Sequence, residues 1–118
     1  MNYMLLIYEE PDAWAGASEA EVNQMMGDYF AFTQEIVDSG EMISGDPLQG
    51  VETATTVTVR GGDTIVTDGP FAETKEVLGG YYLVKVDSLE RAQQLAAKIP
   101  AAKTGKVEVR PVMEIPQG

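Results

Sequence analysis

The order of strand-like and helix-like patterns along the sequence is the feature that most constrains the fold of this chain. Residues 3–8 form a short apolar run, which is too short for a helix and typical of a buried strand. A helix is expected from Ser18 to Gly40, because residues 18–21 have the spacing of a capping box and Gly40 suits a left-handed cap. Residues 41–44 are expected to form a short strand, which a turn at Gly-Asp-Pro closes.

The middle of the chain predicts a β-hairpin. Threonine and valine alternate up to Arg60, a Gly-Gly pair follows, and a second apolar segment returns. The length of the turn leaves two registers open. A two-residue loop sets Val66 beside Val57, whereas a three-residue loop sets Ile65 opposite Val59.

The last third of the chain adds a strand, a helix and a final strand. Residues 79–86 are expected to form a strand, and residues 107–112 form the last one. Between them a helix is capped by Asp87, with Ser88 as a competing cap, and ends at Pro100. Without the hairpin the order is β-α-β-β-α-β. It predicts one α+β domain over the whole chain, a ferredoxin-like sandwich with an antiparallel sheet and an extra hairpin.

The first strand is apolar on both of its faces, which predicts a partner. Its two faces are Tyr3, Leu5 and Ile7 on one side and Met4, Leu6 and Tyr8 on the other. Two helices cover only one face of a sheet, so the other face needs a different cover. A second copy of the same sheet is the simplest cover. We therefore expect a homodimer that packs sheet against sheet.

The absence of Cys and His removes whole classes of chemistry. Disulfides, thiolate nucleophiles, zinc fingers and every Ser-His or Cys-His pair need one of these two residues. We expect no cofactor and no metal, because no segment has the spacing of an EF-hand. No apolar run reaches the roughly 18 residues of a membrane helix. The N-terminus lacks the basic start of a signal peptide and turns acidic at Glu9, so a cytoplasmic location is expected.

The net charge of −11 lies entirely in the first half of the chain. Residues 1–59 contain 11 acids and no Lys or Arg, whereas residues 60–118 contain 8 acids and all 8 bases. Such a charge repels phosphate groups, so we expect neither nucleic acid nor membrane as a partner. The acidic half is either a solvated surface or a docking surface for a basic protein.

Groups able to carry chemistry concentrate between Asp68 and Tyr82. Three carboxylates, one ammonium and two phenols fall within these 15 residues. Asp68 precedes a Gly-Pro bend at a strand end, where a partly buried carboxyl group would act as a general acid or base. Glu73 and Lys75 would bind a ligand, and Tyr81 or Tyr82 would supply a hydroxyl. The same residues also suit a plain turn with an exposed ion pair, and their spacing leaves both interpretations open.

Three residues outside this segment also have two interpretations. Trp14 is either a lid over a pocket or a plug against the sheet. Arg110 either pairs with a neighbour such as Glu108 or faces the cleft as an anion contact. Asp46 suits a turn better than a second carboxylate of the site.

The segment Asp-Gly-Pro-Phe-Ala-Glu-Thr-Lys-Glu at residues 68–76, followed by Leu-Gly-Gly-Tyr-Tyr-Leu, resembles the signature of the DGPF proteins, a branch of the YCII-related family. The likeness extends over nearly the whole chain. It includes the opening strand, the Gly-Asp-Pro-Leu turn, the hairpin entry at Ala54-Thr-Thr-Val and the closing segments at residues 99–102 and 107–111.

This resemblance implies a ferredoxin-like fold of the dimeric α/β-barrel group, in agreement with the expected sheet-to-sheet dimer. Related proteins carry a His and Asp pair in a cleft and are suspected enzymes. Asp68 would correspond to the Asp, but this chain has no His. DGPF proteins are often encoded beside alternative sigma factors, which implies a regulatory role.

Three functions are consistent with these observations. The first is a regulatory homodimer that binds a small molecule in a cleft near Asp68. The second is a cofactor-free lyase or isomerase in which Asp68 is the general acid or base. The third is an acidic module that binds a basic protein, such as a sigma factor, through residues 18–41.

Overall fold

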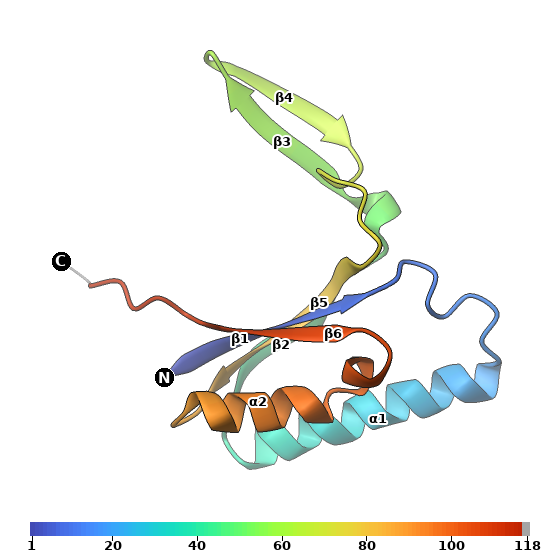
Figure 1. Ribbon diagram of the computed structural model, residues 1–118, viewed down its shortest axis with the longest axis vertical. Helices are drawn as coiled ribbons and strands as arrows, with labels where there is room; N and C mark the ends of the chain where they lie inside the picture. Colours follow the sequence, from blue (N-terminus) through green and yellow to red (C-terminus); the bar gives the residue numbers. More distant parts are fainter. Residues whose placement is uncertain (117–118) are drawn as a thin grey trace.

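Six strands, two α-helices and two short 3-10 helices make up residues 1–116, the part of the chain described by the computed structural model (Figure 1). The strands are β1 (Asn2–Glu9), β2 (Met42–Pro47), β3 (Thr55–Arg60), β4 (Asp63–Asp68), β5 (Val77–Lys85) and β6 (Lys106–Pro111). The helices are α1 (Glu19–Asp38), η1 (Val51–Thr53), α2 (Leu89–Lys98) and η2 (Pro100–Lys103).

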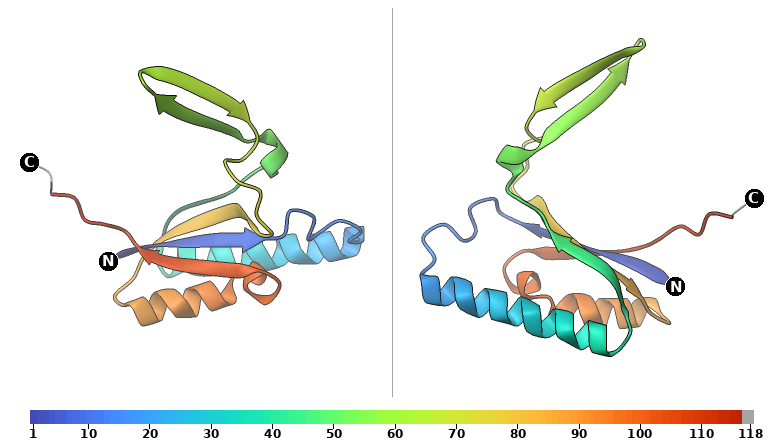
Figure 2. Two further views of the ribbon diagram at one scale, coloured as in Figure 1. Left: turned by 45° about the horizontal axis from the view of Figure 1, so that its top comes forward. Right: turned by 180° about the vertical axis from the view of Figure 1, so that it is seen from behind.

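Four of the strands form one antiparallel sheet in the order β2-β5-β1-β6. Both α-helices lie on the same face of this sheet (Figure 2). The protein is therefore α+β, consistent with the ferredoxin-like fold that the pattern predicts. β6 is an edge strand, and Pro111 stands at its end, where a missing backbone N–H costs least.

The hydrophobic core lies between the sheet and the two helices. On β1 the alternation is as expected, because Leu5 is fully buried while Met4 and Leu6 on the other face are partly exposed. The core consists of Tyr3, Leu5, Ile7, Phe32, Ile36, Tyr82, Val84, Val86, Ala92, Leu95, Ala96, Ile99 and Ala101. One face of the sheet is thus covered within the chain.

The helix starts follow the capping chemistry of the sequence, with one correction. The Oγ atom of Ser18 accepts a hydrogen bond from the Glu21 backbone N–H at 3.1 Å, and the Glu21 side chain accepts one from the Ser18 backbone N–H. In α2 the cap is Ser88 and not Asp87, because the helix begins at Leu89 and Asp87 falls one residue outside the capping position. No helix in residues 1–116 is long and apolar enough to cross a membrane.

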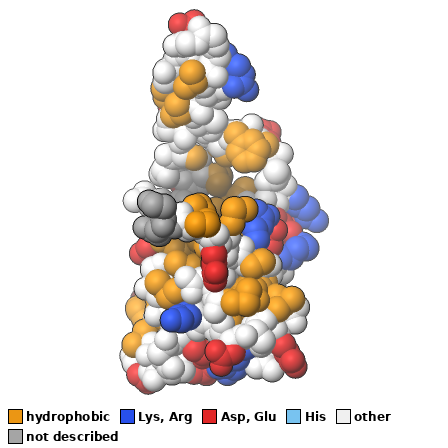
Figure 3. Space-filling view, turned by 90° about the vertical axis from the view of Figure 1, so that its left-hand side faces the viewer, with side chains coloured by type: hydrophobic (Ala, Val, Ile, Leu, Met, Phe, Trp, Pro, Cys, Tyr) orange, Lys and Arg blue, Asp and Glu red, His pale blue; other side chains and the backbone are white. Residues whose placement is uncertain are grey.

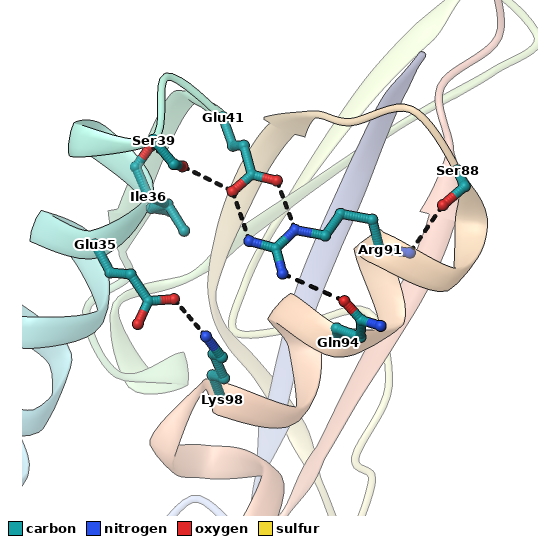
Figure 4. A network of polar contacts seen from close by, with 8 residues as sticks. All are labelled: Glu35, Ile36, Ser39, Glu41, Ser88, Arg91, Gln94 and Lys98. Carbon is teal, nitrogen blue, oxygen red and sulfur yellow. Dashed lines mark hydrogen bonds and ion pairs between the residues drawn. The ribbon is translucent and has the colours of Figure 1, made fainter.

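A charged clamp joins the end of α1 to α2 (Figure 4). The Arg91 guanidinium donates two hydrogen bonds, at 2.8 and 2.9 Å, to the two carboxylate oxygens of Glu41. Its hydrogen bonds to Arg91, against the opposing effect of burial, lower the pKa of Glu41 to about 2. About two turns further along α2, Lys98 donates to Glu35 at 2.6 Å, between side chains that are about half exposed. Two bases of α2 thus neutralise one acid of α1 and one acid just after it.

The hairpin has the two-residue register. Gly61 and Gly62 both have positive φ, 59° and 87°, as a type I′ turn requires. Val57 consequently lies opposite Val66. β3 and β4 pair with each other as a separate two-stranded sheet, which rises from the body on the side opposite the helices (Figure 2).

The turn expected at Gly45-Asp46-Pro47 is wrong, because β2 continues through Pro47. Gly45 allows β2 to approach β5 closely, since a Cβ atom there would lie 2.7 Å from a ring carbon of Tyr82 and 3.0 Å from the Tyr81 carbonyl oxygen. β2 is an edge strand, so a proline at its end is tolerated.

Candidate functional site

The sheet face opposite the helices, here called the open face, has an apolar centre. Residues that pair across antiparallel strands point to the same face, and Leu6 lies between Tyr81 on β5 and Glu108 on β6. The apolar and aromatic side chains that share this face include Met4, Leu6, Tyr8, Tyr81 and Leu83, all partly exposed, and Leu78, which pairs with Tyr8 and is 37% exposed. In the single chain this face is therefore only partly shielded from water.

Polar pairs surround that centre. The hydroxyl of Tyr81 donates to Asp46 at 2.9 Å, and this bond to a carboxylate raises the pKa of the phenol. Arg110 donates to Glu108 at 2.8 Å on the edge strand. Arg110 thus forms the pair with Glu108 that one interpretation expected, and it stands on the open face beside Met4; a role as an anion contact stays a prediction.

The charges of the open face balance. Its acids are Asp46, Glu76 and Glu108, and its bases are Lys85, Lys106 and Arg110. By contrast, α1 on the opposite side of the molecule contains five acids and no base. The open face is thus an uncharged surface, on average, of a strongly acidic protein.

A shallow surface cavity of about 470 Å³, wide open to water, lies beside the first residues of β5 and β6. It is lined by Tyr8, Glu76, Lys106, Val107 and Glu108. Lys106 and Glu76 form an ion pair across it. The cavity therefore offers an aromatic ring, apolar surface and charges of both signs.

Asp68 ends β4 at the base of the hairpin, and its side chain is exposed. The bend after it is fixed by glycine, because Gly69 has a φ of 97° and its N–H bonds to the Ala54 carbonyl at 2.7 Å. Thr56 holds the same bend through a 2.8 Å bond to the Gly69 carbonyl oxygen. Within this chain the backbone at Asp68 is well fixed, while its carboxyl group faces water.

The loop that follows is held by weak contacts. The side chain of Lys75 is 87% exposed and lies 3.8 Å from Glu10, so its partner is neither Glu73 nor Glu76. Exposed pairs of this kind contribute about 0–1 kcal/mol. Glu73 is exposed as well. These two candidate ligand-binding residues stand near Asp68 in sequence, but within residues 1–116 no hydrogen bond or ion pair joins their side chains to Asp68.

Tyr81 and Tyr82 point to opposite faces of the sheet. Tyr82 is 8% exposed, packs edge-on against Phe32 with 5.1 Å between ring centroids, and its hydroxyl lies 2.7 Å from that of Thr33. Tyr82 therefore belongs to the core and cannot share a site with Tyr81 on the open face.

A second polar cluster, at the end of β1, was not predicted. The Trp14 indole N–H donates to the Glu9 carboxylate at 3.2 Å, and burial raises the pKa of Glu9. Burial and the nearby Glu9 charge raise the pKa of Tyr29 to about 12. The sequence carried a signal, because Glu9 has the same parity in β1 as buried Leu5 and Ile7.

Trp14 also lines a groove of about 800 Å³ between α1 and the α2–η2 segment. It is 39% exposed, and its hydrogen bond to Glu9 fixes the loop before α1. In the described part of the chain no three His, Cys, Asp or Glu residues are grouped so that they could hold a metal ion.

The fold and the open face define an α+β domain of ferredoxin-like type with an inserted hairpin. The family model of the YCII-related domain matches residues 1–116. The uncharacterised protein R00369 of Rhizobium meliloti (strain 1021) is 38% identical over 116 residues, which are 95% of this chain and 92% of that protein. This chain therefore belongs to the YCII-related family, as its motifs predict.

Proposed function

We propose that this protein is a homodimer that binds a small molecule between two facing sheets. The observation that carries the proposal is the open face, with an apolar centre around Leu6 and Leu83 and a balanced set of charges around it. A chain of net charge −11 repels its own copy, and this repulsion is weakest where two charge-balanced surfaces meet. A twofold axis would bring each open face onto the same face of its partner, as in a dimeric α/β barrel.

The cavity beside Tyr8 and Lys106 opens at the edge of this interface. Covered by a second sheet, it would become a chamber, with Tyr81 and Arg110 on the same face. Asp68, Glu73 and Lys75 are exposed in the single chain, so their places in such a chamber depend on the second copy.

The dimer is tested with a charge at the centre of the open face. Leu6→Glu would place two like charges in the interface of a dimer, and we expect sedimentation velocity to change from a two-chain to a one-chain species at micromolar concentration. Gln93→Glu, on the exposed side of α2, adds the same charge and should leave the dimer intact. Equal mass in both variants and in the wild type would rule out this interface.

The chamber is tested with benzoate, a probe that has a ring for the apolar wall and a carboxylate for Lys106 or Arg110. We expect saturable amide chemical-shift changes around Tyr8 in the dimer and much weaker ones in the Leu6→Glu monomer. Equal binding by the monomer contradicts a chamber made by two copies. Absence of any change, with benzoate or with benzylammonium, removes this cavity as the site.

The lyase or isomerase alternative uses the same chamber with Asp68 as acid or base. Asp68→Asn keeps the side-chain shape and removes proton transfer. An enzyme would lose turnover while binding the same ligand. A protein that only binds the ligand would show no turnover in either form, and Asp68→Asn would leave its ligand binding unchanged.

A second candidate function is the binding of a basic protein segment by α1. The outer side of this helix exposes Met26, Phe30 and Val37, at 47%, 69% and 52%. The helix contains five acids and no base, and three of these acids line the groove toward α2. An exposed apolar stripe on an acidic helix suits a basic amphipathic helix. With a synthetic Leu/Lys helix as probe, Glu19→Lys combined with Glu21→Lys should weaken binding at low salt. Unchanged binding would end this idea.

A further inference from the structure

The hairpin β3–β4, residues 55–68 and here called the arm, has one apolar face. Val57 and Val66 lie opposite each other, and Val59 follows two residues further along the same face. These three valines are 60%, 63% and 59% exposed. The opposite face has three threonines, the charged residues Arg60 and Asp63 beside the turn, and Ile65 as its large apolar residue. The arm is thus amphipathic, and its valine face is suited to packing against another apolar surface.

The rest of residues 1–116 supplies no such surface. Within this range the two strands of the arm pair with each other alone, and the hydrogen bonds of the arm to neighbouring residues are at its base, around Ala54, Thr56 and Gly69. The radius of gyration is 16.6 Å, against about 13.5 Å for a compact chain of this length. Hydrophobic side chains are exposed on the arm and on the body below it (Figure 3).

A two-stranded hairpin is marginally stable in water without further packing. An ordered arm with three exposed valines therefore needs cover from another molecule. Two features of the molecule favour a second copy of the chain as the partner that covers the valine face. The arm rises on the side of the sheet away from the helices, so a copy that covers the open face would also lie beside the arm (Figure 2). The valine face bears no charge before Asp68 at its base, and thus offers little repulsion to an acidic copy.

We infer that the arm is a clasp whose valine face packs on a second copy of the chain, so that the surroundings of Asp68 are complete only in the dimer. This inference rests on the proposed dimer. It adds a second contact region, distinct from the open face. It also gives Phe71, which follows the Gly-Pro bend and is 89% exposed in the single chain, a packing contact at the edge of that region. Asp68 and Phe71 both stand where the arm joins the body, at the margin of the proposed interface.

The clasp is tested on the full chain by Val57→Thr combined with Val66→Thr. Threonine keeps the β-branched shape and strand preference while its hydroxyl weakens apolar packing. Four altered side chains per dimer should raise the dimer dissociation constant at least about 30-fold. Ile65→Thr, on the other face of the same arm, is the matched control and should change it by less than about 3-fold. Equal effects of the two variants would overturn the assignment of the valine face.

Hydrogen exchange gives a second readout that needs no substitution in the arm itself. We expect amides of residues 55–68 to be protected in the concentrated wild-type protein and to exchange quickly in the Leu6→Glu monomer. Unprotected arm amides in an intact dimer would refute the clasp and leave the proposed dimer standing. A wild-type protein that is a single chain at micromolar concentration would refute the dimer and the clasp together.

Discussion

Removing the charge of Glu41 should cost stability in a pH-dependent way. Glu41→Gln keeps the shape of the side chain and breaks the ionic part of the clamp with Arg91. A carboxyl pKa lowered from 4.5 to about 2 corresponds to about 3 kcal/mol if no screening occurs. The Arg91 side chain is 36% exposed, so water screens the pair, and we expect a loss of about 1–2 kcal/mol at neutral pH.

The direction of the pH dependence follows from the lowered pKa. Since the folded protein holds Glu41 ionised more strongly than the unfolded chain does, the stabilisation is present above the unfolded pKa of 4.5 and is lost as the pH falls toward about 2. Urea denaturation of wild type and Glu41→Gln at several pH values measures this. The gap between the two proteins should close in that window.

The neighbouring pair is the control for this experiment. Glu35 and Lys98 are 47% and 48% exposed, so Glu35→Gln should cost no more than about 1 kcal/mol. A Glu41→Gln effect as small as that of Glu35→Gln, or one that persists unchanged below about pH 2, would refute the view that the clamp is a partly buried charged pair.

Three further predictions concern local structure. Gly27→Ala lies within α1 and has open space at its Cβ, so it should stabilise the protein by about 0.5–1 kcal/mol. Gly105→Ala would place a Cβ 2.1 Å from the Tyr8 carbonyl oxygen and should cost about 2 kcal/mol or more in urea denaturation. Two equally mild effects would contradict this packing. Ser88→Ala should cost about 1 kcal/mol by loss of the α2 cap, and Asp87→Ala less than about 0.5 kcal/mol; the reverse order would restore Asp87 as the cap. Trp14 is the single tryptophan, so its emission should titrate with Glu9 at a midpoint above 4.5 and lose that titration in Glu9→Gln; a titration that persists in Glu9→Gln would assign it to another group.

Much of the fold could be predicted because it depends on local patterns. The alternation in β1, the capping box at Ser18 and the Gly-Gly turn each describe interactions among residues close in sequence. The turn expected at Gly45 failed for the opposite reason, since that glycine is required by the ring of Tyr82, a residue far along the chain.

The candidate site was harder to predict, because its contacts are remote in sequence. Side chains alternate between the two faces along β5, so Tyr81 lies on the open face and its neighbour Tyr82 lies in the core. Nothing local indicates that Lys75 lies near Glu10. The surroundings of Asp68 are a still stronger case, because on our proposal they depend on a second chain.

The central claim is that the open face is covered by a second copy, and the mass of the protein in solution tests it most directly. The chain has a mass of 12.7 kDa. Light scattering at micromolar concentration should give twice that mass for the wild type. The mass of one chain under these conditions would contradict the proposed dimer.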